Sequence, residues 1–127
     1  EDGAKAALET LLFDKKLADV SLEGKDGVQV EANRCILAAR SNSFCSLLYG
    51  GTEDKASVVK VEEYTGSVVR SVVEFCYTDN FVSPNLTDPW ELAQELVGLA
   101  NAAISFELPR LCRLAEEASI DVIDEDS

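Results

Sequence analysis

The spacing of apolar residues changes along this chain, and this change constrains the fold more than any other feature. Apolar and polar residues alternate over 20–32, around turn-forming residues at 24–27, which predicts a β-hairpin. Over much of the remaining chain, apolar residues recur three or four positions apart, as in amphipathic helices. Two strands are marginally stable alone and must pack on helices or pair with further strands. The chain is therefore predicted to be an α+β domain, with a small mixed sheet flanked by a cluster of short helices.

Caps and turns set the expected boundaries. Ser41 or Asn42 can cap a helix, and Asp88 followed by a proline opens another. Trp90, at the start of that helix, is expected to anchor the core or an interface. The predicted order is a helix at 4–17, the hairpin at 20–32, two helices within 33–50 with a break at 41–43, a strand at 57–61, a helix at 66–77, a very short strand at 81–82, and helices starting at 89 and near 109. Residues 120–127 are expected to be a frayed acidic tail.

Residues 66–77 carry conflicting signals. Their valine content favours a strand, whereas the spacing of Val68, Val72, Phe75 and Cys76 favours a helix. Because strict alternation fails, a helix is predicted.

Residues 35–39 are apolar on nearly every side, which predicts that the first helix within 33–50 is buried.

Composition bounds the domain and its partners. The 127 residues, 46% of them hydrophobic, fit one domain with a genuine core. A formal net charge of -13 disfavours nucleic acid and anionic membranes, because both attract clustered Lys and Arg. No apolar run is long enough to span a bilayer. The chain contains no Met and begins at Glu1, so we expect a domain taken from a longer protein.

Histidine is absent, which excludes Ser-His-Asp and Cys-His catalytic pairs and histidine-ligated zinc. Cys35, Cys45, Cys76 and Cys112 form no C-x-x-C pair, and we expect buried free thiols in a reducing compartment. The carboxylates are dispersed, so no metal and no other cofactor is expected. No catalytic residue is therefore predicted. A small enzyme that uses cysteine or paired carboxylates is the alternative from another class, and an exposed cysteine of low pKa would favour it.

Three segments resemble the BTB/POZ domain family. LADVSLEGKDGVQVEANRCILAARSNSF, at 17–44, is similar to the family's opening D-V strand, turn and A-H-R-x-V-L-A-A-R-S-x-x-F. VVEFCYTDNFV, at 72–82, resembles the F-x-Y-T-G-x-V segment. LVGLANAAISFELPRLCRLAEEA, at 96–118, is similar to the closing helices, particularly those of the Rho-BTB type. One departure is Asn33, which stands where the family usually has His.

The resemblance implies a protein–protein interaction module that homodimerises through its N-terminal helix and the hairpin region. Leu8, Leu11 and Leu12 form an apolar stripe on that helix and are the expected dimer interface. The resemblance also implies that Asp19 and Arg34 line a charged pocket at the dimer groove. A partly buried ion pair that fixes the hairpin is an equally weighted alternative for these two residues.

The resemblance further implies a substrate-adaptor role in a cullin-3 ubiquitin ligase. Family members that bind this cullin usually carry an apolar-x-Glu motif, whose equivalent here begins at Thr52 and ends at Asp54. Neither matches the motif, so weaker binding is expected; Leu48 and Tyr49 are the other residues expected to face the cullin. A dimerisation domain that recruits corepressors or other regulatory proteins for a transcription regulator is the alternative. A cytoplasmic or nuclear location, or both, is expected.

Overall fold

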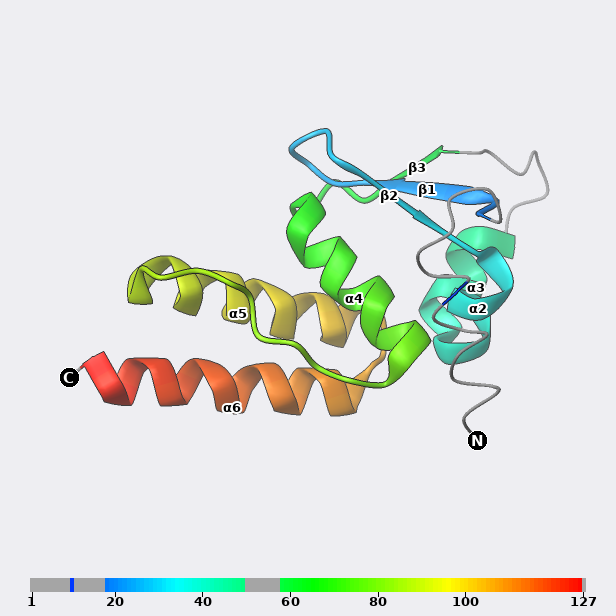
Figure 1. Ribbon diagram of the computed structural model, residues 1–127. Coiled ribbons are helices and arrows are strands. Elements are labelled where there is room, and N and C mark those ends of the chain that lie inside the picture. The colour runs from blue at the N-terminus through cyan, green and yellow to red at the C-terminus, as the bar shows by residue number, and fades with distance from the viewer. Residues whose placement is uncertain (1–9, 11–17, 50–57, 127) are drawn as a thin grey trace.

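The computed structural model describes position 10 and residues 18–49 and 58–126 (Figure 1). The helix predicted at 4–17 lies outside the described residues except at position 10, which is helical. The described elements are β1 (Val20–Glu23), β2 (Gln29–Ala32), α2 (Arg34–Arg40), α3 (Asn42–Tyr49), β3 (Val58–Lys60), α4 (Gly66–Thr78), α5 (Pro89–Ser105) and α6 (Pro109–Asp126). The predicted α+β class is confirmed.

The three described strands form a mixed sheet in the order β2-β1-β3. β1 and β2 are antiparallel, with Leu22 opposite Val30, and β1 and β3 are parallel, with Leu22 opposite Val59. Val20, Leu22, Val30 and Ala32 are all buried, so the alternation in the sequence marks the face that meets the core. The hairpin and the third strand were both predicted correctly.

Helix α4 lies between the sheet and the α5–α6 hairpin, with α2 and α3 at one end of the sheet (Figure 1). Its apolar residues are buried on several sides, and Val72 and Val73 have no exposed surface. The predicted helix is confirmed, and its valine content reflects the fact that it is packed against other elements on several sides. By contrast, α2 is only partly buried: Leu37 is in the core, but Cys35 and Ala39 are exposed.

The α5–α6 hairpin closes the core. The Asp88 carboxylate caps α5, accepting a hydrogen bond from the Glu91 N–H at 3.1 Å. On α6, Leu111, Ala115 and Ser119 recur every four residues and are buried. The helix then continues to Asp126, whereas a frayed tail from residue 120 was expected. A helix already anchored by packing extends at little cost, because only its nucleation is unfavourable.

The short strand expected between α4 and α5 is absent. Residues 81–82 form no strand in the structure, and Val82 is 68% exposed. Asp79, just after α4, has a left-handed backbone (φ 62°) that turns the chain away from the helix axis, and the segment then crosses to α5 without joining the sheet. Trp90, in the first turn of α5, is 69% exposed, so it does not anchor the core, and its expected role in an interface stays a prediction.

Asp79 also joins three helices. Its carboxylate pairs with Arg40 of α2 at 2.5 Å and with Arg110 of α6 at 2.9 Å. Both guanidinium groups lie over the Phe75 ring of α4, at 5.6 and 5.7 Å from its centroid. Although the ion pairs are exposed and individually weak, together with the ring they tie the ends of α2, α4 and α6 to one point.

Candidate functional site

The structure brings Asp19 and Arg34 together through the backbone. The Arg34 N–H donates a hydrogen bond to the Asp19 carboxylate at 2.8 Å. Arg34 is the first residue of α2, and Asn33, which precedes it, makes no capping bond with its own side chain. Asp19, fifteen positions earlier in the chain, therefore accepts a hydrogen bond from one of the N–H groups that have no partner within the helix at its start. A charged pocket at these residues stays a prediction.

We expect Asp19→Ala to lower the free energy of unfolding by about 1 kcal/mol, the usual cost of a lost helix cap. Asp19→Asn keeps an acceptor oxygen and should cost less than the alanine variant. Urea denaturation of both variants measures the difference. Equal losses in the two would show that the charge of Asp19, and not its cap bond, is what stabilises the fold.

Asn33 forms a reciprocal pair with Tyr77 of α4. The Asn33 N–H donates to the Tyr77 hydroxyl at 2.7 Å, and that hydroxyl donates to the Asn33 side-chain oxygen at 2.5 Å. Both residues are buried, and burial raises the pKa of Tyr77 to about 12. The residue that departs from the family pattern thus holds the β2–α2 junction against the central helix.

Five of the predicted site residues lie outside the described residues. They are the expected dimer residues Leu8, Leu11 and Leu12, and the expected cullin-facing residues Thr52 and Asp54. Their roles stay predictions.

The other two residues expected to face the cullin, Leu48 and Tyr49, lie on α3 and differ in exposure. Tyr49 is 46% exposed and the neighbouring Leu47 is 45% exposed, so both are available to a partner. Leu48 is buried, which corrects the expectation that it faces one. It follows Phe44 by four residues, and residues at that spacing share one helix face, here the face in the core.

The start of α3 is fixed against the connection between α5 and α6. The rings of Phe44 and Phe106 stack in parallel with their centroids 4.2 Å apart. The Ser41 hydroxyl accepts a hydrogen bond from the Phe44 N–H at 3.1 Å and donates one to the Phe106 carbonyl. Ser41, rather than Asn42, therefore caps α3, and it also secures the α5–α6 corner.

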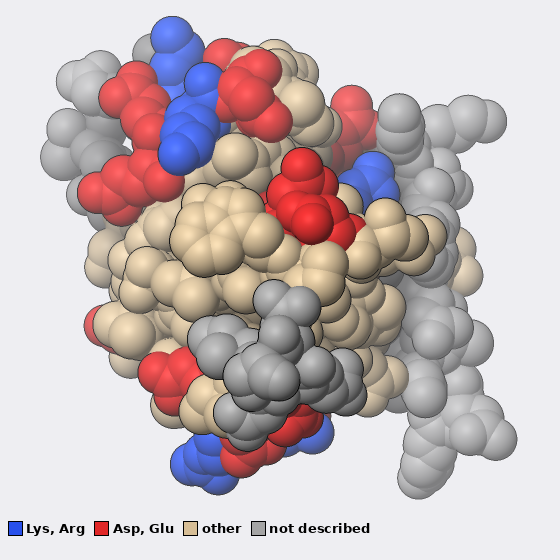
Figure 2. Space-filling view, turned by 90° about the vertical axis from the view of Figure 1, so that its left-hand side faces the viewer, with Lys and Arg blue, Asp and Glu red and all other residues tan. Residues whose placement is uncertain are grey.

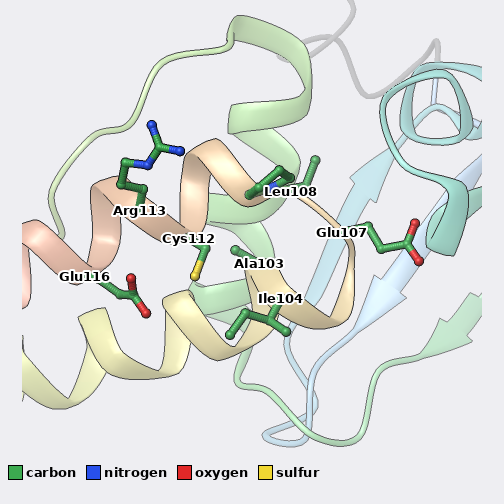
Figure 3. Close-up of a pocket in the computed structure, with 8 residues that line it drawn as sticks. Ala103, Ile104, Glu107, Leu108, Cys112, Arg113 and Glu116 are labelled. Atoms are coloured by element: carbon green, nitrogen blue, oxygen red, sulfur yellow. The ribbon is translucent and has the colours of Figure 1, made fainter.

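A pocket of about 370 Å³, which we call the Ile104 pocket, opens beside this corner. In Figure 3, the Cys112 thiol of α6 points toward α5 near Ile104, and Glu116 lies one turn further along α6. Ile104 is 60% exposed, so the mouth of the pocket is apolar and open to a partner. The sequence analysis missed this pocket because its walls come from two helices whose packing the apolar spacing does not specify.

The four cysteines differ in exposure, whereas four buried thiols were expected. Cys35 and Cys45 are exposed, Cys76 is buried and Cys112 is half-buried. Burial raises the pKa of Cys76 to about 12, and burial together with the nearby Glu116 carboxylate raises that of Cys112. Raised pKa values disfavour the nucleophilic thiolate at these two positions.

Among the described residues, no three Cys, Asp or Glu side chains gather closely enough to hold a metal ion. None of the helices in the described ranges is both long and apolar enough to cross a membrane.

The sequence was also compared with known protein families. The family model of the BTB/POZ domain matches residues 8–122. The chain belongs to the BTB/POZ family. The resemblance stated from the sequence is confirmed. Domains of this family are protein-interaction modules and are generally non-enzymatic.

Curated relatives share part of this BTB/POZ domain. Kelch-like protein 3 of mouse is 35% identical over 63 residues, and the human protein is 33% identical over the same length. These matches cover 49% of this chain and 11% of each relative, so the chain corresponds to only a small part of those proteins. Among solved structures, the BTB domain of zebrafish PATZ1 superposes with a TM-score of 0.71 at 20% identity, covering 92% of this chain and 91% of that one. That likeness supports the fold.

Proposed function

We propose that this BTB/POZ domain homodimerises and acts as a substrate-adaptor domain of a cullin-3 ubiquitin ligase. The observation that supports cullin binding is that α3 and the α5–α6 corner pack together and form one surface. Stacking of Phe44 on Phe106 holds α3, with its exposed Leu47 and Tyr49, against the corner that bears the Ile104 pocket. The partial similarity to Kelch-like protein 3 supports the same role.

The chemistry of this surface suits a helical partner. Tyr49 offers a rigid aromatic ring with a hydrogen-bonding hydroxyl, a residue type enriched among binding hot spots. The Ile104 pocket accepts an apolar side chain, and Glu116, near the Cys112 thiol, supplies a charge at its border (Figure 3). Such a surface is apolar at its centre and polar at its edge, as protein interfaces usually are.

We expect titration calorimetry against the cullin-3 N-terminal domain to give a micromolar dissociation constant. Tyr49→Ala and Ile104→Ala should each weaken binding by about tenfold or more, because each truncates an exposed apolar anchor. Thr52→Met with Asp54→Glu should tighten binding by about thirtyfold, since it restores the apolar-x-Glu motif.

Val82→Ala is the control for this titration, because Val82 is exposed on the segment before α5 and should not change the affinity. Nanomolar affinity of the unmodified domain would contradict the argument from the degenerate motif. Absence of binding at about 100 μM cullin, with the dimer intact, would favour the corepressor-recruiting alternative.

The dimer is tested separately by light scattering, which should report about twice the 13.8 kDa chain mass at micromolar protein. Leu12→Glu should shift the population toward monomer or aggregate, because it places a charge in the expected interface. A wild-type monomer at high concentration would contradict the dimer. We further propose a cytoplasmic or nuclear location, where free thiols persist.

A further inference from the structure

A second hollow, of about 410 Å³, lies between the β1–β2 turn, the start of α4, and α5. We call it the α4–α5 groove. Its apolar lining comes from Val68, Leu86 and Gly98, with the Tyr64 side chain beside them. Figure 2 views the molecule from the side where α5 begins and shows Asp and Glu side chains, together with Lys and Arg, around a broad uncharged area.

Close backbone contacts build the wall of the groove. The Lys25 N–H donates to the Tyr64 carbonyl at 2.8 Å, and the Gly66 N–H donates to the Asp26 carboxylate at 2.9 Å. A Cβ atom at Gly24 would lie 2.5 Å from the Gly66 nitrogen, so glycine is needed for this approach. The hairpin turn is thereby fixed against α4.

Gly98 keeps the floor of the groove open. It lies inside α5, where glycine is less favourable than alanine by about 1 kcal/mol. A Cβ atom there would have its nearest neighbour, a methyl group of Val68, at 3.7 Å, which is an ordinary contact. Nothing in the packing therefore requires glycine, and its effect is to leave space above Val68 between the two helices.

The charges around this space are unbalanced. Glu63, Glu91 and Glu95 line the groove with Lys25 as the one cation among the lining residues. Within the described part of the chain, none of these three glutamates forms an ion pair with a Lys or Arg side chain. The Ser67 hydroxyl donates to the Glu95 carboxylate at 2.6 Å, which fixes its position.

We propose that the α4–α5 groove binds an arginine-containing basic segment of a partner protein. An arginine combines an apolar stem, which matches Val68, Leu86 and the gap at Gly98, with a planar cation. The cation can bind the Glu91 and Glu95 carboxylates in the bidentate manner typical of guanidinium groups. The surface involved is distinct from α3 and the Ile104 pocket, so this proposal stands apart from cullin binding.

The test uses the 127-residue chain and four fluorescein-labelled nonapeptides, each with two arginines separated by one to four residues in a serine and leucine background. Fluorescence anisotropy in about 150 mM salt, where long-range charge effects are screened, should give a micromolar dissociation constant for at least one peptide. The same peptide with citrulline, the neutral analogue of arginine, should bind at least tenfold more weakly.

Paired variants separate the groove from bulk charge. Glu91→Gln with Glu95→Gln should weaken binding at least tenfold, whereas Glu117→Gln with Asp121→Asn, which removes two exposed charges from α6, should leave it within about twofold. Gly98→Met, which fills the groove without changing charge, should also weaken binding at least tenfold, and Gly98→Ala should weaken it less.

Equal losses in the two charge-removing variants would overturn the proposal in favour of non-specific attraction. Failure of all four peptides to bind would also overturn it, as would a Gly98→Met variant that binds like wild type. Circular dichroism of each variant is the check that the fold is retained.

Discussion

Phe44→Ala is expected to lower the free energy of unfolding by about 3–5 kcal/mol, the usual cost of removing a fully buried aromatic side chain. Phe44 has no exposed surface, and its ring stacks on Phe106 at 4.2 Å. The substitution therefore leaves a cavity and also removes the contact that holds α3 against the α5–α6 corner. Among the substitutions considered, this one should have the largest effect on stability.

Chemical denaturation of the variant and wild type measures the loss. Tyr49→Ala is the matched control: it truncates an aromatic residue on the same helix, but one that is 46% exposed, and should cost less than about 1 kcal/mol. A Phe44→Ala loss below 1 kcal/mol would show that α3 is held by other contacts. Since Phe44 supports the proposed cullin surface, the variant should also lose cullin binding.

Local patterns were sufficient to predict most of the fold. Alternation over 20–32 placed β1 and β2, and the three- and four-residue spacing over 66–77 placed α4 despite its valine content. The cap at Asp88 located the start of α5. These features depend on a residue and its near neighbours, which is the information that a single sequence carries.

The errors arose where distant contacts decide the outcome. Trp90 and Leu48 are both large apolar residues on helices, but one is exposed and the other is buried. Their exposure depends on how each helix is rotated against the others, which hydrophobicity alone does not determine. One overlooked signal was local: the family's Y-T-G has glycine where this chain has Asp79, and the structure shows a positive φ at that position.

The candidate sites were only partly predictable for the same reason. The hairpin predicted that Asp19 and Arg34 lie close together, but not that the backbone N–H of Arg34 makes the contact. The Ile104 pocket and the α4–α5 groove are both formed by segments far apart in the sequence. In the groove, the sequence signals are Gly98 inside a predicted helix and glutamates at 91 and 95 with no basic residue nearby on that helix.

Raising the pH from 8 to 11 is expected to lower the free energy of unfolding by about 4 kcal/mol through Cys76 and Tyr77. The ordinary pKa values of 9.0 for the thiol and 10.0 for the phenol are each raised to about 12 in the folded protein, chiefly by burial. The native state therefore retains these protons where the unfolded chain releases them. The contribution of each group to the free energy of unfolding is fully present below its ordinary pKa and is lost as the pH rises toward 12.

Unfolding measured at a series of pH values can assign this loss to the two groups. At pH 11 about 3 kcal/mol should come from Cys76 and about 1 kcal/mol from Tyr77, so Cys76→Ala should flatten the decline more than Tyr77→Phe. Both variants lower stability at neutral pH, and hence the slope with pH is compared rather than the absolute value. If Cys76→Ala kept the wild-type slope, water would have to reach the thiol in the native state, and the core around α4 would be more open than the structure shows.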